Sequence, residues 1–152
     1  MNSPTLDKRL VHRLGYAGLL PFIAFCLACW LASPAWFPLF IKNQLAYGIL
    51  IFSFLGGIHW GAALLTPGLT TQQAQRALIW SIVPALAGWG ATMIGGFGFA
   101  VLLIGFIVAY RVDKNLYIWY GMPAWLIELR FRLSCIVVAA LALTVVAVNV
   151  RG

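Results

Sequence analysis

The chain has 152 residues, of which 63% are hydrophobic and only 9% are charged, against about 45–50% and about 25% in a typical soluble domain. Its three acidic residues cannot supply the charged surface that a water-soluble protein of this size needs. Intrinsic disorder, collagen and a disulfide scaffold are excluded by the same composition. We therefore expect an integral membrane protein with an all-α fold.

Five apolar stretches are each about long enough to cross a hydrocarbon core of roughly 30 Å as an α-helix. They predict a five-transmembrane-helix bundle that forms a single domain over residues 1–152, with spans at about 14–33, 45–65, 77–93, 97–110 and 133–150. The third and fourth spans are short and meet at Gly95-Gly96, which indicates a tight helical hairpin. Because Pro34 follows the small-residue pair Ala32-Ser33, we interpret the first span as a retained helix rather than a removed signal peptide.

The basic residues predict the orientation of the bundle. Eight of the ten fall at the N-terminus or in the connections after the second and fourth spans, and two fall on the other side. The larger group comprises Lys8, Arg9, Arg13, Arg76, Arg111, Lys114, Arg130 and Arg132, and the smaller comprises Lys42 and Arg151. The N-terminus is therefore expected in the cytoplasm or matrix and the C-terminus outside. This topology accounts for the net charge of +7 without a nucleic-acid partner.

The segment at about residues 115–132 is expected to lie at the membrane surface. Tryptophans are enriched at membrane interfaces, and arginines there reach lipid phosphates. Trp119, Trp125, Arg130 and Arg132 have these roles in our interpretation, with membrane lipids as their partners. Apolar residues at helical spacing in this segment predict a short interfacial helix before the last span.

Small residues on the second and third spans predict where helices pack. Lipid is as apolar as leucine, so membrane helices associate through close contacts between small residues. The predicted packing residues are Ser53, Gly56, Gly57, Gly61, Ala85 and Gly88. Ser53, Gly57 and Gly61 repeat every four positions, and the face that carries Gly56 lies roughly 160° away around the helix. A helix with two packing faces is expected at the centre of the bundle.

His59 is the candidate functional residue, because an ionisable side chain at membrane depth is costly. It is expected roughly 9 Å from the cytoplasmic end of its span, at the level of Pro21 and Pro84. Each proline frees a carbonyl, at Ala17 and Trp80, so His59 is either held by such a carbonyl or offers one nitrogen to a ligand. The predicted cofactor pocket comprises His59, Trp60, Trp80 and Ser81. Its cofactor stays unknown, with quinone and haem as the candidates.

The cysteines and Asp113 provide weaker evidence for a functional site than His59 does. Cys26-x-x-Cys29 is expected roughly 9–13 Å from the level of His59, so we interpret the cysteines as packing residues and predict no metal site. Asp113 is expected to pair with its basic neighbours, and a contact with His59 is the alternative. Catalytic triads, paired carboxylates and phosphate loops are absent from the sequence, so no catalytic residue is predicted. An enzyme with His59 as a base oriented by Asp113 stays a weaker alternative.

Three segments carry a resemblance to a known family. They are residues 14–22 (Leu-Gly-Tyr-Ala-Gly-Leu-Leu-Pro-Phe), residues 53–61 (Ser-Phe-Leu-Gly-Gly-Ile-His-Trp-Gly) and residues 123–133, which begin with Pro-Ala-Trp and end with Leu-Arg-Phe-Arg-Leu. The chain resembles a small bacterial inner-membrane family, defined by domain of unknown function 3429 and related to mitochondrial transmembrane protein 69. The resemblance implies five helices and an inner membrane, bacterial or mitochondrial, but no activity.

The leading functional hypothesis is a non-catalytic accessory subunit or assembly factor of a larger complex, with other membrane protein subunits as partners. Its basis is the pair of small-residue faces on the second span, which is more packing surface than five helices need. The shared bacterial and mitochondrial setting of the family suggests a respiratory complex. The alternative hypothesis is a quinone- or haem-binding membrane protein with a pocket around His59.

Overall fold

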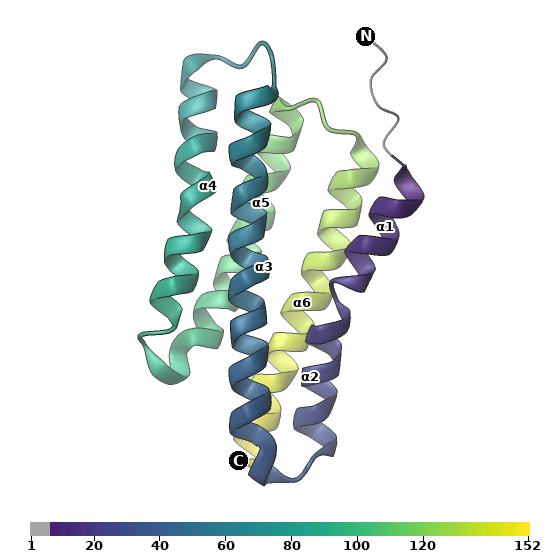
Figure 1. Ribbon diagram of the computed structural model, residues 1–152, viewed down its shortest axis with the longest axis vertical. Helices are drawn as coiled ribbons and strands as arrows, with labels where there is room; N and C mark the ends of the chain where they lie inside the picture. The colour runs from purple at the N-terminus through teal and green to yellow at the C-terminus, as the bar shows by residue number, and fades with distance from the viewer. Residues whose placement is uncertain (1–6) are drawn as a thin grey trace.

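The computed structural model describes residues 7–152, which form α-helices joined by short connections (Figure 1). The helices are α1 (Lys8–Ala17), α2 (Leu20–Leu31), α3 (Phe37–Leu65), α4 (Thr71–Ala91), α5 (Gly98–Trp119) and α6 (Ala124–Arg151). Single 3-10 turns at Pro34–Trp36 and Gly95–Phe97 precede α3 and α5. The described part of the chain contains no β-strand, in agreement with the all-α expectation.

The helices pack side by side, with α3 in contact with α2, α4 and α5, and α6 in contact with α1, α2 and α5. Figure 1 shows the start of α1 at the same end of the bundle as the α3–α4 and α5–α6 connections, and the C-terminus at the opposite end. This alternation is the one that the expected topology requires. The end that faces the cytoplasm stays a prediction.

Four helical segments are long and apolar enough to cross a membrane, namely Lys8–Leu31, Pro34–Leu65, Gly95–Trp119 and Ala124–Arg151. The first of these joins α1 and α2, which are bent against each other at Gly18. The helix α4 is not among the four, because its first turns, from Thr71 to Arg76, are mostly polar. The described chain is therefore a membrane helical bundle of four strongly apolar segments and the less apolar α4.

The last two helices extend beyond the limits expected from hydropathy. α5 continues past Tyr110 to Trp119, and α6 begins at Ala124. Residues 115–132, expected to include a separate interfacial helix, are instead the end of α5, a short turn and the start of α6. The reason is that the buried face of α5 continues beyond the end of its apolar segment. Its buried positions recur every three or four residues at Leu102, Phe106, Ala109, Asp113 and Leu116.

The turn after α5 places α5 and α6 side by side. Gly121 has a φ of 66°, in the left-handed region that a side chain disfavours. The N–H of Met122 donates to the carbonyl of Tyr117 at 2.9 Å, which closes the end of α5. Pro123 is extended and precedes the first turn of α6. Because the connection is so short, residues at equal distances from it on α5 and α6 lie opposite each other.

The face of α3 that carries Gly56 packs inside the bundle, and Ser53, predicted on the other small-residue face, lies at its edge. A Cβ added at Gly56 would lie only 2.5 Å from the carbonyl oxygen of Ser81 on α4. A Cβ added at Gly88 on α4 would lie 2.9 Å from the side chain of Ile49 and 3.7 Å from the hydroxyl oxygen of Ser53 on α3. The backbones of α3 and α4 therefore approach each other closely at these glycines.

The remaining predicted packing residues make no such contact within the described chain. A Cβ added at Gly57 or Gly61 would have no atom within 4 Å, and Ala85 is exposed. The expectation of a packing contact at Ala85 is corrected by the direction of α4, which faces α3 with its buried residues Ser81, Pro84 and Gly88. Ala85 lies at the edge of this face, roughly 40° around the helix from Ser81 on the side away from Pro84, and is exposed.

Candidate functional site

Three ionisable side chains from three helices meet inside the bundle. His59 lies six residues before the end of α3, Asp113 six residues before the end of α5, and Arg130 six residues after the start of α6. These three helix ends lie at the same end of the bundle (Figure 1). A helix rises about 1.5 Å per residue, so the three side chains share one level roughly 9 Å inside that end. Only 0% of His59, 1% of Asp113 and 7% of Arg130 is exposed.

The carboxylate of Asp113 connects these side chains. His59 Nε2 lies 2.8 Å from Asp113 Oδ1, and Arg130 Nε donates to Asp113 Oδ2 at 2.9 Å. His59 Nδ1 lies 3.3 Å from the hydroxyl oxygen of Tyr120, and Arg130 Nη1 donates to the hydroxyl of Ser134. With a neutral ring, the consistent arrangement has the Tyr120 hydroxyl donating to Nδ1 and the Nε2–H donating to Asp113. We call these five residues the buried polar cluster.

Asp113 and Arg130 have other partners than those expected from the sequence. Asp113 lies on the buried face of α5, whereas its neighbours Arg111 and Lys114 are exposed and turned away. Arg130, expected at lipid phosphates, points inward to Asp113 instead. A buried carboxylate is costly without a counter-charge, and Arg130 on the facing helix supplies that charge. The alternative contact, between Asp113 and His59, is the one that the structure contains.

The four residues expected to form a cofactor pocket do not meet in one place. His59 has partners at both ring nitrogens, namely Asp113 and Tyr120 rather than a proline-freed carbonyl. Trp60 is 48% exposed, and the hydroxyl of Ser81 donates to the carbonyl of Leu78 at 2.6 Å. Trp80 Nε1 is buried without a partner among the described residues. A haem iron or a quinone oxygen therefore reaches a nitrogen of His59 only if one of its two partners moves away.

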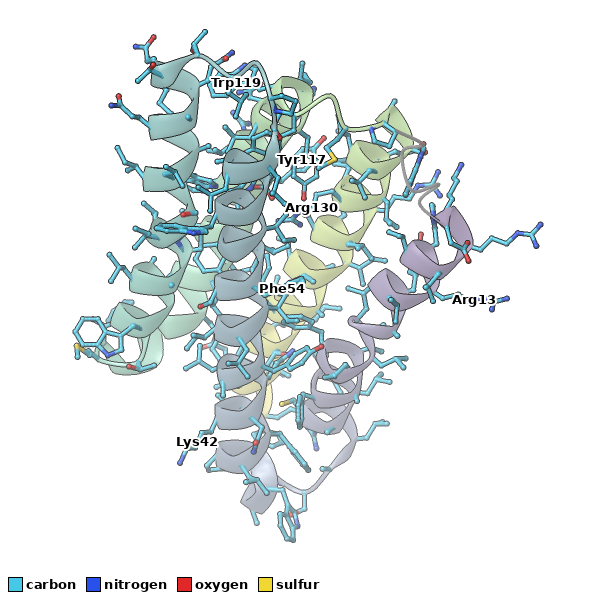
Figure 2. All side chains as sticks on the ribbon, turned by 45° about the horizontal axis from the view of Figure 1, so that its top comes forward. Arg13, Lys42, Phe54, Tyr117, Trp119 and Arg130 are labelled. Carbon is cyan, nitrogen blue, oxygen red and sulfur yellow. The ribbon has the colours of Figure 1, made fainter. Side chains whose placement is uncertain are left out.

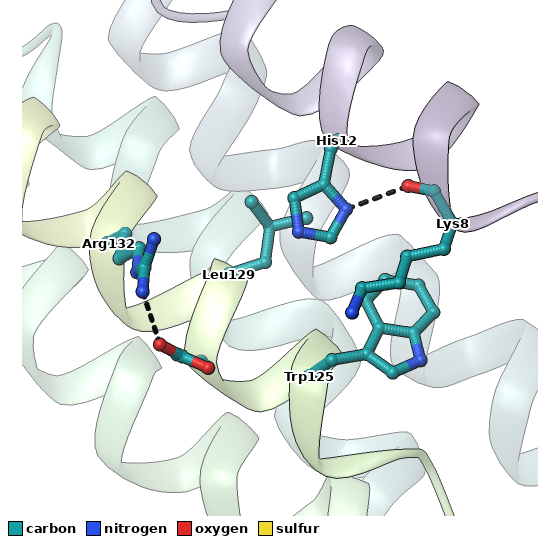
Figure 3. Close-up of a pocket in the computed structure, with 6 residues that line it drawn as sticks. Lys8, His12, Trp125, Leu129 and Arg132 are labelled. Atoms are coloured by element: carbon teal, nitrogen blue, oxygen red, sulfur yellow. Dashed lines mark hydrogen bonds and ion pairs between the residues drawn. The ribbon is translucent and has the colours of Figure 1, made fainter.

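Two of the residues expected at the interface line a polar pocket of about 190 Å³ between α1 and α6 (Figure 3). Arg132 forms an ion pair with the carboxylate one turn before it. Trp125 stacks on His12 with the ring centroids 5.4 Å apart, and Lys8 Nζ lies 5.7 Å from the centroid of Trp125. Trp119 ends α5 and lines a separate hollow on the surface.

Sequence reasoning missed Tyr120 and Ser134 as members of the buried polar cluster. Tyr120 follows Asp113 by seven residues, which places both on one face of the helical turn that ends α5. Ser134 follows Arg130 by four residues, the spacing at which side chains on a helix touch. The fourth span predicted from hydropathy ends at about residue 110, before Asp113 and Tyr120, so the helical spacing of these two residues does not show in the predicted elements.

We expect Tyr120→Phe to lower the free energy of unfolding by about 0.5–1.5 kcal/mol at neutral pH, because the variant loses the hydroxyl that bonds His59. Burial, together with repulsion from Tyr117 and Asp113, raises the pKa of Tyr120 to about 12, against about 10 in an unfolded chain. The protonated hydroxyl thus stabilises the fold fully below about pH 10, and this contribution is lost as the pH rises towards about 12. Thermal unfolding in detergent across this range checks the prediction. If the wild type and Tyr120→Phe lost stability equally as the pH rises through this range, the prediction would be contradicted.

Comparisons with known proteins cover most of the chain. It is 35% identical over 131 residues to transmembrane protein 69 of Xenopus tropicalis, a match that covers 84% of this chain and 50% of that protein. It is 27% identical over 137 residues to transmembrane protein 69 of Mus musculus, with 88% and 54% covered. The chain thus spans about half the length of these curated relatives. No solved structure matches it. The family described as "Protein of unknown function (DUF3429)" matches residues 8–146, and the chain, a multi-pass membrane protein, belongs to that family.

Proposed function

We propose that the chain is a non-catalytic membrane subunit or assembly factor of a larger complex. The observation that supports this proposal is the outward face of α3 at Gly57 and Gly61, where an added Cβ would meet no atom within 4 Å. Leu50 and Leu64, seven residues to either side of Gly57, are 67% and 65% exposed, so the side of α3 that carries Gly57 is turned away from the bundle, and only Ser53 of the predicted stripe lies near α4. Glycines spaced by four residues let a second helix approach closely, which is a main source of helix association in lipid.

The membrane that we propose is the bacterial inner membrane or, in a eukaryotic cell, the mitochondrial inner membrane. The support for this choice, and for a respiratory complex as the larger assembly, is the resemblance to a family with bacterial and mitochondrial members. The cytoplasmic or matrix side would be the end that carries eight of the ten basic residues. A ligand-binding function at His59 is not proposed, because both ring nitrogens are engaged.

Purification at native expression in a mild detergent tests the assembly role. We expect the wild-type chain to migrate on a blue-native gel with stoichiometric membrane subunits, which mass spectrometry identifies. The double variant Gly57→Ile/Gly61→Ile should associate at least about tenfold more weakly, since the added side chains hold a partner helix away. Ala85→Ile, at an exposed small residue of α4, is the matched control and should keep the complex.

Two results would overturn the proposal. One is a wild-type chain that migrates only as a free monomer, above all if it carries a bound chromophore such as one with a Soret band. The other is a Gly57→Ile/Gly61→Ile variant that recovers the same subunits as the wild type. If subunits of the respiratory chain are absent from an otherwise stoichiometric complex, the assembly role stands and the respiratory assignment is wrong.

A further inference from the structure

An apolar groove lies between α1 and α3 and has α6 as its floor. Its volume is about 370 Å³, within the range of about 300–1,000 Å³ that is typical of small-molecule pockets. Leu14 on α1, Ile58 on α3 and Leu133 on α6 are among the aliphatic side chains that line it. Figure 2 labels three further lining residues, Phe54, Tyr117 and Arg130. Nearly all of this surface suits a hydrocarbon chain.

Arg130 is the charged side chain of the groove, and one of its nitrogens is unpartnered. The side chain is 7% exposed, its Nε bonds Asp113 and its Nη1 bonds Ser134. Nη2 is buried and has no hydrogen-bond partner among residues 7–152. Buried donors are almost always paired, and an unpaired one calls for an acceptor from outside the chain. Arg130 is also one of the residues that line the groove, which makes the groove the candidate place for such an acceptor.

The charge of the guanidinium decides which kind of acceptor fits. Asp113 already balances the positive charge of Arg130 through a direct ion pair. An anionic head would therefore bring an excess negative charge into a buried site, at a large cost in desolvation. A neutral carbonyl oxygen satisfies Nη2 without an additional charge. The aromatic ring of Tyr117 offers a flat wall beside this position.

We propose that the groove binds a neutral membrane lipid with a carbonyl head, of the isoprenoid quinone class. The head carbonyl accepts a hydrogen bond from Arg130 Nη2, and the tail lies along the side chains of α1, α3 and α6. The site differs from the pocket expected around His59, because His59 does not contact the ligand. One wall of the groove borders the outward face of α3, because Phe54 lies seven residues before Gly61. Binding to the isolated chain nevertheless does not depend on the assembly role.

Equilibrium binding of radiolabelled decylubiquinone to the purified full-length chain in detergent tests the proposal. We expect saturable binding to the wild type. Ile58→Trp fills the groove and should weaken binding at least about tenfold. Ile79→Trp, on the exposed side of α4 with 66% of the residue accessible, is the matched control and should bind like the wild type. Circular dichroism checks that each variant is folded, and Leu14→Trp blocks the groove from α1 if Ile58→Trp does not fold.

Arg130→Lys tests the role of the guanidinium. A lysine ammonium can still pair with Asp113, but it lacks the forked nitrogens that reach both the cluster and the groove. We expect about tenfold weaker binding of decylubiquinone to this variant, close to the effect of losing one hydrogen bond to a charged donor. Unchanged binding to a folded Arg130→Lys variant, or to a variant with a blocked groove, would overturn the proposal.

Competition distinguishes the occupants. Decylbenzene has the same chain without a carbonyl, and decanoate has a carboxylate in place of the neutral head. We expect each to displace decylubiquinone at least about tenfold less well than unlabelled decylubiquinone does. Equal competition by decylbenzene would reduce the groove to a non-specific apolar surface, and stronger competition by decanoate would identify a fatty-acid site. Either result, like the absence of saturable binding, rejects the quinone class.

Discussion

Replacing Asp113 by alanine is expected to lower the free energy of unfolding by about 3–5 kcal/mol. The carboxylate bonds both His59 and Arg130, and it is only 1% exposed. Without it, the guanidinium of Arg130 keeps its charge in the interior with no counter-charge, and the Nε2–H of His59 loses its acceptor. Reversible unfolding of the purified chain in mixed detergent micelles, followed by circular dichroism, measures the loss.

Replacement of the whole ion pair provides the informative control. The double variant Asp113→Leu/Arg130→Met removes both charges, so it should unfold closer to the wild type than Asp113→Ala does. Glu128→Ala removes the carboxylate of the exposed ion pair with Arg132 and should leave stability nearly unchanged. If Asp113→Ala is as stable as Glu128→Ala, the buried polar cluster does not hold α3, α5 and α6 together in the way that we describe.

Replacing Gly56 by alanine is expected to cost about 1–3 kcal/mol of unfolding free energy. The added Cβ would lie 2.5 Å from the carbonyl oxygen of Ser81 and 3.1 Å from the ring of Pro84. Neither neighbour is the end of a flexible side chain, so α3 and α4 have to move apart to make room. The same unfolding measurement in detergent checks this prediction.

Gly57→Ala is the matched control, one residue further along the same helix. A Cβ at Gly57 meets no atom within 4 Å, and alanine favours a helix over glycine by up to about 1 kcal/mol. The isolated Gly57→Ala chain should thus be as stable as the wild type or more stable. Equal stability of Gly56→Ala and Gly57→Ala would show that α3 and α4 are not in close contact at this level.

The two faces of α3 make folding and assembly separable by experiment. Substitutions at Gly56 and in the buried polar cluster act on contacts within the chain, so they should lower stability in the isolated protein. Substitutions at Gly57 and Gly61 act on the outward face, so they should leave the isolated chain stable and weaken only association. A variant of the outward face that unfolds the chain by itself would contradict this separation.

Composition and hydropathy alone identified the class of protein, because crossing a lipid core demands long apolar helices and leaves few charged residues. The segments around Gly15, His59 and Trp125 were enough to identify the family, which the family match confirms. Small residues marked α3 as a packing helix, because close backbone approach in lipid requires them. These features are local, so they can be read from one stretch of chain at a time.

Tertiary structure decided the partners of each polar side chain. Hydropathy placed Asp113 in a loop and Arg130 at lipid phosphates, because a charged residue lowers the average of any window that contains it. In the folded chain the two residues neutralise each other across α5 and α6, and His59 joins them from α3. The position of α4 likewise decides that the Gly56 face of α3 is covered and that the face at Gly57 and Gly61 is not. The sequence determines which residues need a partner, and only the packing of distant helices decides which partner each one meets.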